Sequence, residues 1–421
     1  MRRNQKVGAS VEHPLERSSV LSQGMGWVAM KRLPVSLLAT SLAALLALLP
    51  LAAKAAETAP VAGFETKAAQ AYLIEARTGT VLLAKAENQP VSPASLAKIM
   101  VAETVLAALD KREISLDTSY PVTEHAWRTG GAPSGTATMF AALKSTIRVE
   151  DLLKGVMVLS ANDACIILGE GLAGSEPQFA ERMTNRARDL GLTISTFKNA
   201  SGLPDPGNRV TMKELVLLSQ HLQASYPDQY KIYLQPDFEW NKIRQRNRNP
   251  LIAAGNGIDG LATGFTEGQG YSIAASIERD GKRLFVGLGG LASDKERQEE
   301  TKRVLEWGLS TFDYRRLFAP GEAVGEVSVF GGETSSVAVV AKEPIEIFVP
   351  IKDSERVSGH ITYTWPIYAP VAPGREVGRL SLYAGSRLLR EVPLFAKDSV
   401  PEAGLSKHAF DAVKELLLFW W

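Results

Sequence analysis

The sequence predicts an α/β domain, followed by a small β-rich domain and a C-terminal amphipathic helix. Three observations support this order. A strand hairpin near residue 70 and Gly-bounded strands after residue 257 enclose a series of helical segments, so one sheet should join both ends of the first domain. At residues 318–321 the pattern changes to short alternating stretches separated by turns. From residue 406 the pattern becomes helical again.

The first domain is expected over residues 62–313. Its predicted strands cover residues 70–76, 81–84, 257–277 (a strand pair) and 284–288. Its predicted helices cover residues 95–109, 149–172, 177–190, 211–222 and 295–309. The stretch Ser160-Ala161-Asn162-Asp163 interrupts the helical run over residues 149–172. A glycine-rich loop is expected at residues 130–135.

The second domain is expected over residues 318–400 as a β-sandwich-like module with no helical periodicity. In the tail, residues 406–421, apolar side chains occupy one helical face: Phe410, Val413, Leu416, Leu417 and Trp420. One interpretation is a helix lying on a membrane surface. The alternative is a helix docked on the β module.

Composition excludes several kinds of site. The net charge of +1 gives no reason to expect nucleic acid as a partner. Cys165 is the one cysteine, which excludes an internal disulfide and a cysteine-rich metal site; it is expected to be a small core residue. The five histidines show no ligand spacing.

Residues 1–55 are interpreted as an N-terminal extension followed by a signal peptide. Lys31 and Arg32 precede an apolar run over residues 33–53 that ends in a small-x-small sequence. Residues 1–29 would then be an upstream extension. The alternative is an uncleaved membrane anchor, because the run is long enough to span a bilayer. Cleavage would indicate a bacterial envelope protein.

Ser95 and Lys98 are the first candidate catalytic pair. Ser95 is expected at the N-terminus of a helix, and Lys98 follows on the same face one turn later. A hydroxyl there lies in the positive field of the helix end. The amine can take the hydroxyl proton if burial lowers its pKa. The simpler interpretation is a capping serine and a surface lysine.

Two further elements could complete this site. Ser160 and Asn162 can both point into one cleft from a turn, although Ser-x-Asn is also a common capping turn. In the Gly-rich strand at residues 260–266, Thr263 offers a hydroxyl and Gly264 allows close approach of the backbone. This strand could also be an ordinary edge strand.

Taken together, these elements resemble the Ser-x-x-Lys, Ser-x-Asn and Lys-Thr-Gly motifs of penicillin-recognising serine enzymes. The chain is most similar to the low-molecular-mass D-alanyl-D-alanine carboxypeptidases from about residue 65 to its C-terminus. The matching stretches are residues 93–98, 127–131, 160–164 and 202–205. The resemblance implies a penicillin-binding transpeptidase/β-lactamase-like fold, an antiparallel sheet with helices on both sides. It also implies a location in the periplasm, at the outer face of the inner membrane.

The resemblance implies a role for each site residue. Ser95 would attack the carbonyl between the last two D-alanines of a peptidoglycan stem pentapeptide, with neutral Lys98 as base. Ser160 would relay the proton, and Asn162 would fix Lys98 and the substrate amide. The backbone N–H groups of Ser95 and Phe265 would form the oxyanion hole, and each donor in such a hole contributes about 3 kcal/mol. β-Lactams would acylate the same serine, and the resemblance implies that no metal or organic cofactor is needed.

One position departs from the family pattern: Ala262 stands where the third motif has lysine. Loss of that charged partner should cost on the order of 2–4 kcal/mol, or roughly 30- to 1,000-fold in rate or binding. Arg297 matches a family arginine that contacts the substrate carboxylate. Thr263 and Gly264 are also expected to bind the substrate. The basic stretch at residues 244–249, near Trp240, either lines the substrate approach or is a solvated loop.

Two alternatives to a carboxypeptidase remain open at this stage. Ala262 favours a catalytically weak penicillin-fold protein that binds peptidoglycan in a structural role. A β-lactamase would require fast deacylation. No Glu-x-x-x-Asn motif stands in the corresponding loop, which holds Asp205 between two prolines.

Overall fold

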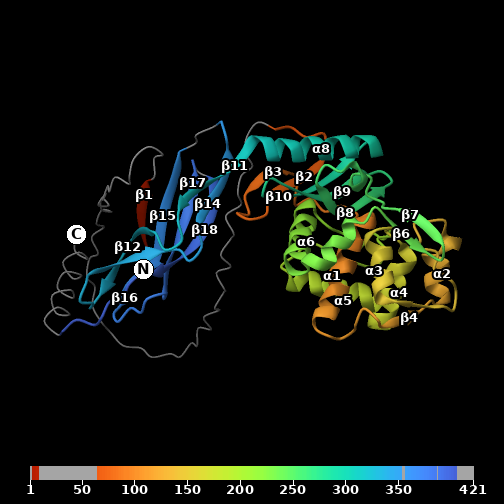
Figure 1. Cartoon of the computed structure of the whole chain (residues 1–421), viewed down its shortest axis with the longest axis horizontal. Helices are drawn as coiled ribbons and strands as arrows, with labels where there is room; N and C mark the ends of the chain where they lie inside the picture. The colour runs from red at the N-terminus through yellow and green to blue at the C-terminus, as the bar shows by residue number, and fades with distance from the viewer. Residues whose placement is uncertain (1, 9–63, 353–355, 386, 405–421) are drawn as a thin grey trace, which may run out of the picture. The chain divides into compact units, whose positions relative to one another are not determined.

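The computed structural model describes residues 2–8, 64–352, 356–385 and 387–404 (Figure 1). The chain forms two compact units. Of the described residues, one unit holds 64–315 with 348–352, and the other holds 2–8, 316–347, 356–385 and 387–404. The predicted signal peptide and the predicted C-terminal helix lie outside the described residues.

The first unit contains the antiparallel five-stranded sheet, in the order β3-β2-β10-β9-β8. Its strands are β2 Gln70–Glu75, β3 Val81–Lys85, β8 Ile258–Thr266, β9 Gly270–Arg279 and β10 Lys282–Leu291. Strands from both ends of the unit therefore share one sheet, which confirms the predicted fold. β8 is an edge strand of this sheet.

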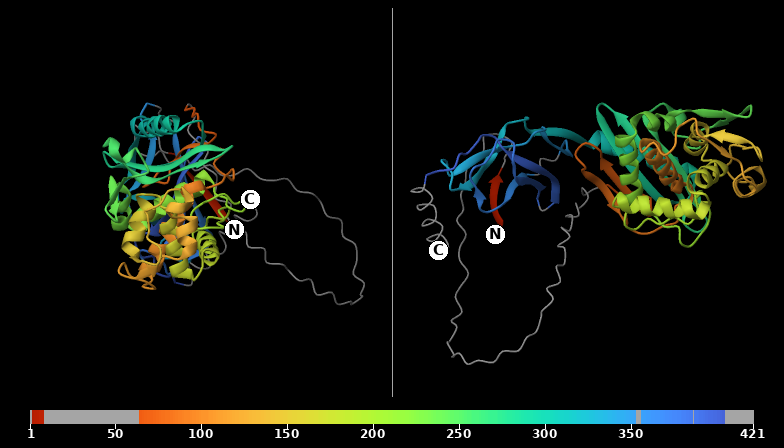
Figure 2. Two further views of the ribbon diagram at one scale, coloured as in Figure 1. Left: turned by 90° about the vertical axis from the view of Figure 1, so that its right-hand side faces the viewer. Right: turned by 90° about the horizontal axis from the view of Figure 1, so that it is seen from below.

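Side chains alternate between the two faces of this sheet, as the strand period requires. On β10, for example, Phe285 packs into the core of the large helical layer, while Leu284 and Val286 face the other core. The helical layer contains α1 Ala97–Asp110, α3 Val149–Met157, α4 Asn162–Ala173, α5 Glu176–Asp189 and α6 Met212–Ser225. The opposite face is covered by α8 Asp294–Thr311 (Figures 1 and 2).

The helices begin and end where the sequence indicates. Side-chain oxygens of Ser175, Thr211 and Ser293 accept the free N–H groups at the starts of α5, α6 and α8. The predicted helical run over residues 149–172 is divided into α3 and α4, and Ser160 lies in the connection with a φ of 54°. This division turns the second motif towards the start of α4.

Several short elements of the first unit were not predicted. They are α2 Glu124–Thr129, α7 Pro227–Tyr230, and the strand pairs β4 Ser119–Pro121 with β5 Thr146–Arg148 and β6 Asp237–Trp240 with β7 Ile243–Arg246. The basic stretch at residues 244–249 therefore begins in a strand. Short 3₁₀ turns also occur at Ala94–Leu96, Ala132–Ser134, Lys231–Leu234 and Ile252–Ala254.

The second unit is the predicted β-rich module. A seven-stranded sheet has the order β1-β15-β17-β18-β13-β12-β16, and β11 pairs with β14. The strands of the sheet are β1 Arg2–Gly8, β12 Ala323–Phe330, β13 Ser336–Val340, β15 Val357–Thr364, β16 Ile367–Tyr368, β17 Glu376–Ala384 and β18 Arg387–Ala396. β11 Phe312–Phe318 and β14 Ile345–Pro350 each have residues in both units. The sequence analysis did not predict β1, which pairs antiparallel with β15.

Candidate active site

The nucleophile candidate lies in the turn that precedes α1. Ser95 is the middle residue of the 3₁₀ turn Ala94–Leu96, and α1 begins at Ala97. Lys98 therefore lies on the first turn of the helix, directly after the serine. Its Nζ lies 2.9 Å from Ser95 Oγ. The hydroxyl and the amine are thus in hydrogen-bond contact, as the three-residue spacing predicted.

Burial gives the Lys98 amine its chemistry. The residue is only 2% exposed. Burial lowers the pKa of Lys98 to about 8; the Cys165 thiol raises it and the positive charge of Arg248 lowers it further. Near pH 8 a large fraction of the amine is therefore neutral and can accept a proton from Ser95.

A second contact fixes the amine in place. Lys98 Nζ donates to the backbone carbonyl of Ser201 over 2.7 Å. The next residue, Gly202, has a φ of +81°, and a Cβ there would lie 1.8 Å from the carbonyl oxygen of Ala94. Only glycine lets this loop approach the Ser95 turn so closely. The close approach of the loop to the Ser95 turn thus explains why glycine stands at position 202, in one of the stretches that match the family.

Ser160 and Asn162 lie beside this pair with free polar atoms. Ser160 lines a small cavity together with Lys98. Its buried Oγ and the buried Oδ1 of Asn162 have no hydrogen-bond partner among the described residues. Asn162 Nδ2 donates to Thr136 Oγ1 over 2.9 Å. A substrate could supply the missing partners, since buried polar groups are normally paired.

Asp163 holds this motif in place, a role that the sequence analysis missed. The carboxylate is fully buried and accepts from Thr138 Oγ1 at 2.6 Å and from the backbone N–H groups of Met139 and Ala141 at 3.0 Å. Asp163 thereby ties the loop after the glycines at residues 130–131 to the start of α4. The position of Asp163, directly after Asn162, was the one feature of the sequence that could have indicated this role.

The third motif lies on the edge strand β8, next to the Ser95 turn. Ala262 and Thr263 line the same cavity as Lys98 and Ser160. A Cβ on Gly264 would lie 3.3 Å from Ala94 Cβ and from the Pro93 carbonyl oxygen. β8 therefore passes directly beside the nucleophile turn. Phe265, at the outer end of this stretch, is 55% exposed.

Arg297 reaches the same strand from the other face of the sheet. It lies in α8 and is 6% exposed. Its Nη1 donates to the Gly264 carbonyl over 3.4 Å, and its guanidinium also bonds to Asp294. Burial lowers the pKa of Arg297 and Asp294 raises it. An existing carboxylate partner means that a substrate carboxylate would have to share this arginine.

A polar hairpin borders the site. In the β6–β7 hairpin, Gln245 Nε2 donates to the Thr138 carbonyl over 3.0 Å, and Asn241 Nδ2 donates to the Phe140 carbonyl over 3.3 Å. The hairpin is thus tied to the loop that Asp163 holds. Sequence reasoning missed these contacts because both donors are polar surface residues without a periodic pattern.

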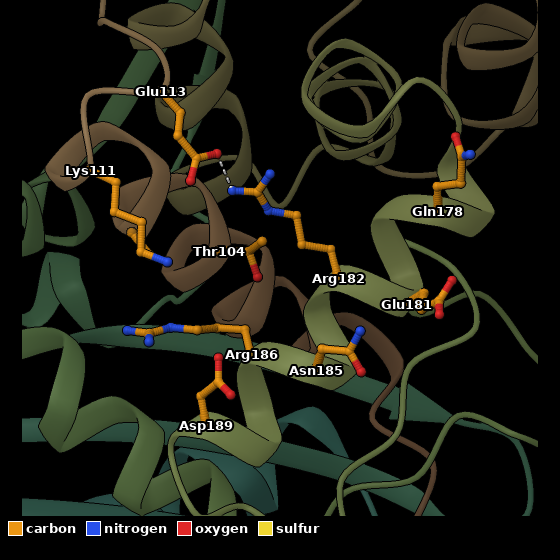
Figure 3. Close-up of a pocket in the computed structure, with 10 residues that line it drawn as sticks. Thr104, Lys111, Glu113, Gln178, Glu181, Arg182, Asn185, Arg186 and Asp189 are labelled. Atoms are coloured by element: carbon orange, nitrogen blue, oxygen red, sulfur yellow. Dashed lines mark hydrogen bonds and ion pairs between the residues drawn. The ribbon is translucent and has the colours of Figure 1, made fainter.

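A larger groove of about 400 Å³ lies elsewhere on this unit, over α1 and α5 (Figure 3). Its lining is charged, and Arg182 pairs with Glu113 across it at 2.6 Å. None of the predicted site residues lines this groove. Within the described ranges, no group of three or more His, Cys, Asp and Glu could hold a metal ion, and no helix is long and apolar enough to cross a membrane.

The arrangement can perform acyl transfer. A serine hydroxyl contacts a buried amine with a lowered pKa, and free polar atoms and an edge strand surround it. These features define a class of serine enzymes that form acyl intermediates with lysine as the base.

The comparisons with known proteins identify the family. The family described as D-alanyl-D-alanine carboxypeptidase, peptidase S11, matches residues 53–289, more than half of the chain. The penicillin-binding protein 5 C-terminal domain matches residues 312–402. The chain belongs to the peptidase S11 family and is a serine-type D-alanyl-D-alanine carboxypeptidase, as the resemblance implied.

Individual relatives agree with this assignment. D-alanyl-D-alanine carboxypeptidase DacC of Escherichia coli is 33% identical over 81% of this chain and 86% of its own length. The crystal structure of penicillin-binding protein 5 from Haemophilus influenzae has a TM-score of 0.73 and 29% identity, covering 81% of this chain and all of that one. Penicillin-binding protein D2 of Listeria monocytogenes in its cefotaxime-bound form has a TM-score of 0.53 and 30% identity, covering 59% and 99%. The non-catalytic and β-lactamase alternatives are not favoured.

Proposed function

We propose that this carboxypeptidase removes the terminal D-alanine from peptidoglycan stem pentapeptides through an acyl-enzyme on Ser95. The observation that carries the proposal is the 2.9 Å contact between Lys98 Nζ and Ser95 Oγ, with the pKa of Lys98 lowered to about 8. A neutral amine at this distance can act as a general base.

In the first step, the Ser95 hydroxyl proton passes to Lys98 while Oγ bonds to the carbonyl carbon. The tetrahedral intermediate then collapses, the carbon–nitrogen bond breaks, and the leaving amine receives a proton through Ser160. The free Oγ of Ser160 and the cavity it shares with Lys98 support this relay. Water then attacks the ester, and the shortened peptide is released as Ser95 regains its proton.

Backbone and side-chain groups around Ser95 would hold the substrate. We assign the oxyanion hole to the N–H groups of Ser95 and Phe265, which the close approach of β8 to the serine turn supports. Asn162 Oδ1 would accept the substrate amide N–H. Thr263, Gly264 and Arg297 would contact the terminal residue along the edge strand, where Arg297 already bonds to the Gly264 carbonyl.

β-Lactams are proposed to acylate Ser95 as well. The relative from Listeria monocytogenes was solved in cefotaxime-bound and ampicillin-bound forms, and at 30% identity it supports the same behaviour here. The ring amide of a β-lactam would occupy the position of the D-Ala-D-Ala amide. The acyl-enzyme would then persist because its deacylation is slow.

The domain assignment and location are part of this proposal. Residues 62–313 would form the peptidase domain and residues 318–400 the β-rich domain. Residues 1–55 would direct export to the periplasm, and residues 406–421 would hold the enzyme at the outer face of the inner membrane. The charged and apolar pattern of these two terminal segments supports the assignment.

Two measurements on the exported protein test the mechanism. Intact-mass spectrometry after incubation with benzylpenicillin should show one adduct, and peptide mapping should place it on Ser95. D-alanine release from a stem pentapeptide should accompany it. Ser95→Ala should abolish both signals and leave the fold intact, because the Ser95 side chain is only half-buried.

The outcomes separate the alternatives. An adduct without D-alanine release would favour the binding role in peptidoglycan. Rapid turnover of benzylpenicillin would favour a β-lactamase. An adduct on another residue would contradict Ser95 as the nucleophile.

A further inference from the structure

The replacement of the motif lysine by Ala262 removes a positive charge from the cleft. Ala262 lines a cavity of about 10 Å³ beside Lys98, Ser160 and Thr263, close to the space of one water molecule. A substrate that ends in D-alanine brings a carboxylate to this region. Arg297 alone would bind this carboxylate weakly, because its guanidinium already bonds to Asp294.

A second arginine lines the same cavity. Arg248 follows β7 in the basic stretch, and the residue is exposed to solvent. Its positive charge acts on Lys98 and lowers the pKa of that amine. Among the described residues, no side-chain hydrogen bond or ion pair of Arg248 is found. Arg244, by contrast, pairs with Asp237 at 2.7 Å.

The backbone around Arg248 is held firmly. Its N–H donates to the Val158 carbonyl over 3.0 Å. Asn247 Nδ2 donates to the Tyr233 and Gln235 carbonyls at 3.0 and 2.8 Å. Asn249, 2% exposed, donates to the Gly260 carbonyl on β8 over 2.8 Å. The backbone of Arg248 is therefore fixed between the α3–α4 connection and the strand that carries Ala262, which places the start of its side chain beside the cavity.

We infer that Arg248 supplies the positive charge that the family places at position 262, and that it binds the terminal carboxylate of the substrate. This inference rests on the proposed function of Ser95 and Lys98. A guanidinium offers a carboxylate two parallel hydrogen bonds, and an arginine without a partner has no ion pair to break first. Its charge also disfavours the ammonium form of Lys98, so one side chain would bind the carboxylate and favour a neutral base.

Arg248→Ala, Arg248→Lys and Arg246→Ala test the binding role. We expect Arg248→Ala to lower kcat/KM for a D-Ala-D-Ala peptide by about 30-fold, and Arg248→Lys to retain part of the activity. For the same peptide with a C-terminal amide, Arg248→Ala should change little. Arg246 is the matched control: it is exposed, lies two residues away and does not line the cavity, so its replacement should have less than a twofold effect.

Restoring the lysine tests the substitution itself. In the background of Ala262→Lys, loss of Arg248 should cost less than about threefold, because a second cation is present. The pH midpoint of acylation by benzylpenicillin should rise in Arg248→Ala and return in the double variant. A merely structural role would not produce this return.

Three results would overturn the inference. These are unchanged kinetics in Arg248→Ala, an equal loss on the amide substrate, or an equal loss in the Ala262→Lys background. Thermal unfolding of each variant shows whether a loss reflects misfolding, and Arg248→Lys then serves as the second test. If the unchanged protein neither forms the penicillin adduct nor releases D-alanine, the proposed function fails first and this inference with it.

Discussion

Lys98 Nζ lies 2.9 Å from Ser95 Oγ, one helical turn away, and 98% of the lysine is hidden from solvent. A charged lysine in this position would be poorly solvated, so the helix holds an amine that gives up its proton near pH 8. The reactivity of the serine therefore depends on how well the helical layer excludes water from Lys98.

The first prediction is a pH profile for acylation. Below pH 8 the amine is largely protonated and cannot accept the Ser95 proton. The rate of acylation by benzylpenicillin should therefore rise about tenfold per pH unit up to about pH 8 and then level off. Stopped-flow measurements between pH 5.5 and 9.5 check this. Lys154→Ala, which removes a lysine paired with Glu150 at 2.7 Å, should leave the midpoint unchanged.

A rate independent of pH across this range would show that Lys98 is not the base. A midpoint well above 9 would show that burial does not lower the pKa of Lys98 as described.

The second prediction concerns Gly202, compared with a matched glycine. Gly202 and Gly191 have φ values of +81° and +78°, but only at Gly202 would a Cβ meet another atom, the Ala94 carbonyl oxygen at 1.8 Å. Gly191→Ala should lower the free energy of unfolding by about 1 kcal/mol, the cost of the backbone conformation. Gly202→Ala should cost more and displace the Ser201 carbonyl from Lys98. Acylation should then slow at least tenfold.

Urea unfolding and acylation kinetics measure the two effects. Equal stability and equal kinetics in the two variants would contradict the close approach of this loop to the Ser95 turn.

Much of the fold could be predicted because burial leaves a pattern in the sequence. The α1 run lacks Gly and Pro and is almost wholly buried, and the β9 and β10 strands alternate between two cores. The β6–β7 hairpin leaves no such pattern, since its residues are exposed or half-buried and mainly polar. The existence of this hairpin depends on contacts with residues 138–140, far away in the sequence.

The site, too, has residues that the local sequence predicts and residues that only the folded structure reveals. Ser95 and Lys98 share a helical turn, so local spacing predicts their contact. The hydrogen bonds of Asp163, and the place of Arg248 beside the cavity, depend on residues that only the folded chain brings near. The structure brings Lys98, Ser160 and Thr263 to one cavity, while the catalytic roles stay predictions. The expected membrane helix lies beyond the described residues.

The third prediction concerns the buried carboxylate of Asp163. Asp163→Ala would leave the Thr138 hydroxyl and the N–H groups of Met139 and Ala141 without an acceptor. At about 1–3 kcal/mol for each unpaired group, the free energy of unfolding should fall by roughly 3 kcal/mol or more. Acylation should also slow, because the loop that contacts Asn162 is released.

Chemical denaturation measures the loss, and Asp189→Ala is the control, because Asp189 is an exposed aspartate at the end of α5. The control should stay within about 0.5 kcal/mol of the unchanged protein. A stable Asp163→Ala variant with normal acylation would show that the loop does not need this carboxylate.

The last prediction concerns Glu103, a fully buried carboxylate on α1. Arg186 donates to its Oε1 at 2.9 and 2.7 Å, and His221 Nε2 lies 3.4 Å away. Burial raises the pKa of Glu103, while Arg186 and His221 lower it. Desolvation thus outweighs the pairing, so Glu103→Gln should change stability by less than about 1 kcal/mol. Arg186→Met keeps the packed stem but leaves the carboxylate alone, and should cost about 3 kcal/mol at pH 7.

The pH dependence distinguishes this explanation from lost packing. An acid whose pKa is raised by folding binds more protons in the folded than in the unfolded state. It therefore lowers the free energy of unfolding increasingly as the pH rises above the ordinary pKa of the acid. The deficit of Arg186→Met should therefore be smaller at pH 5 than at pH 7, because protonation of Glu103 removes the unpaired buried charge. Adding Glu103→Gln to Arg186→Met should restore stability at pH 7 and remove this dependence. A deficit that is equal at both pH values, with or without Glu103, would assign the loss to the stem of Arg186 instead of the charge it supplies.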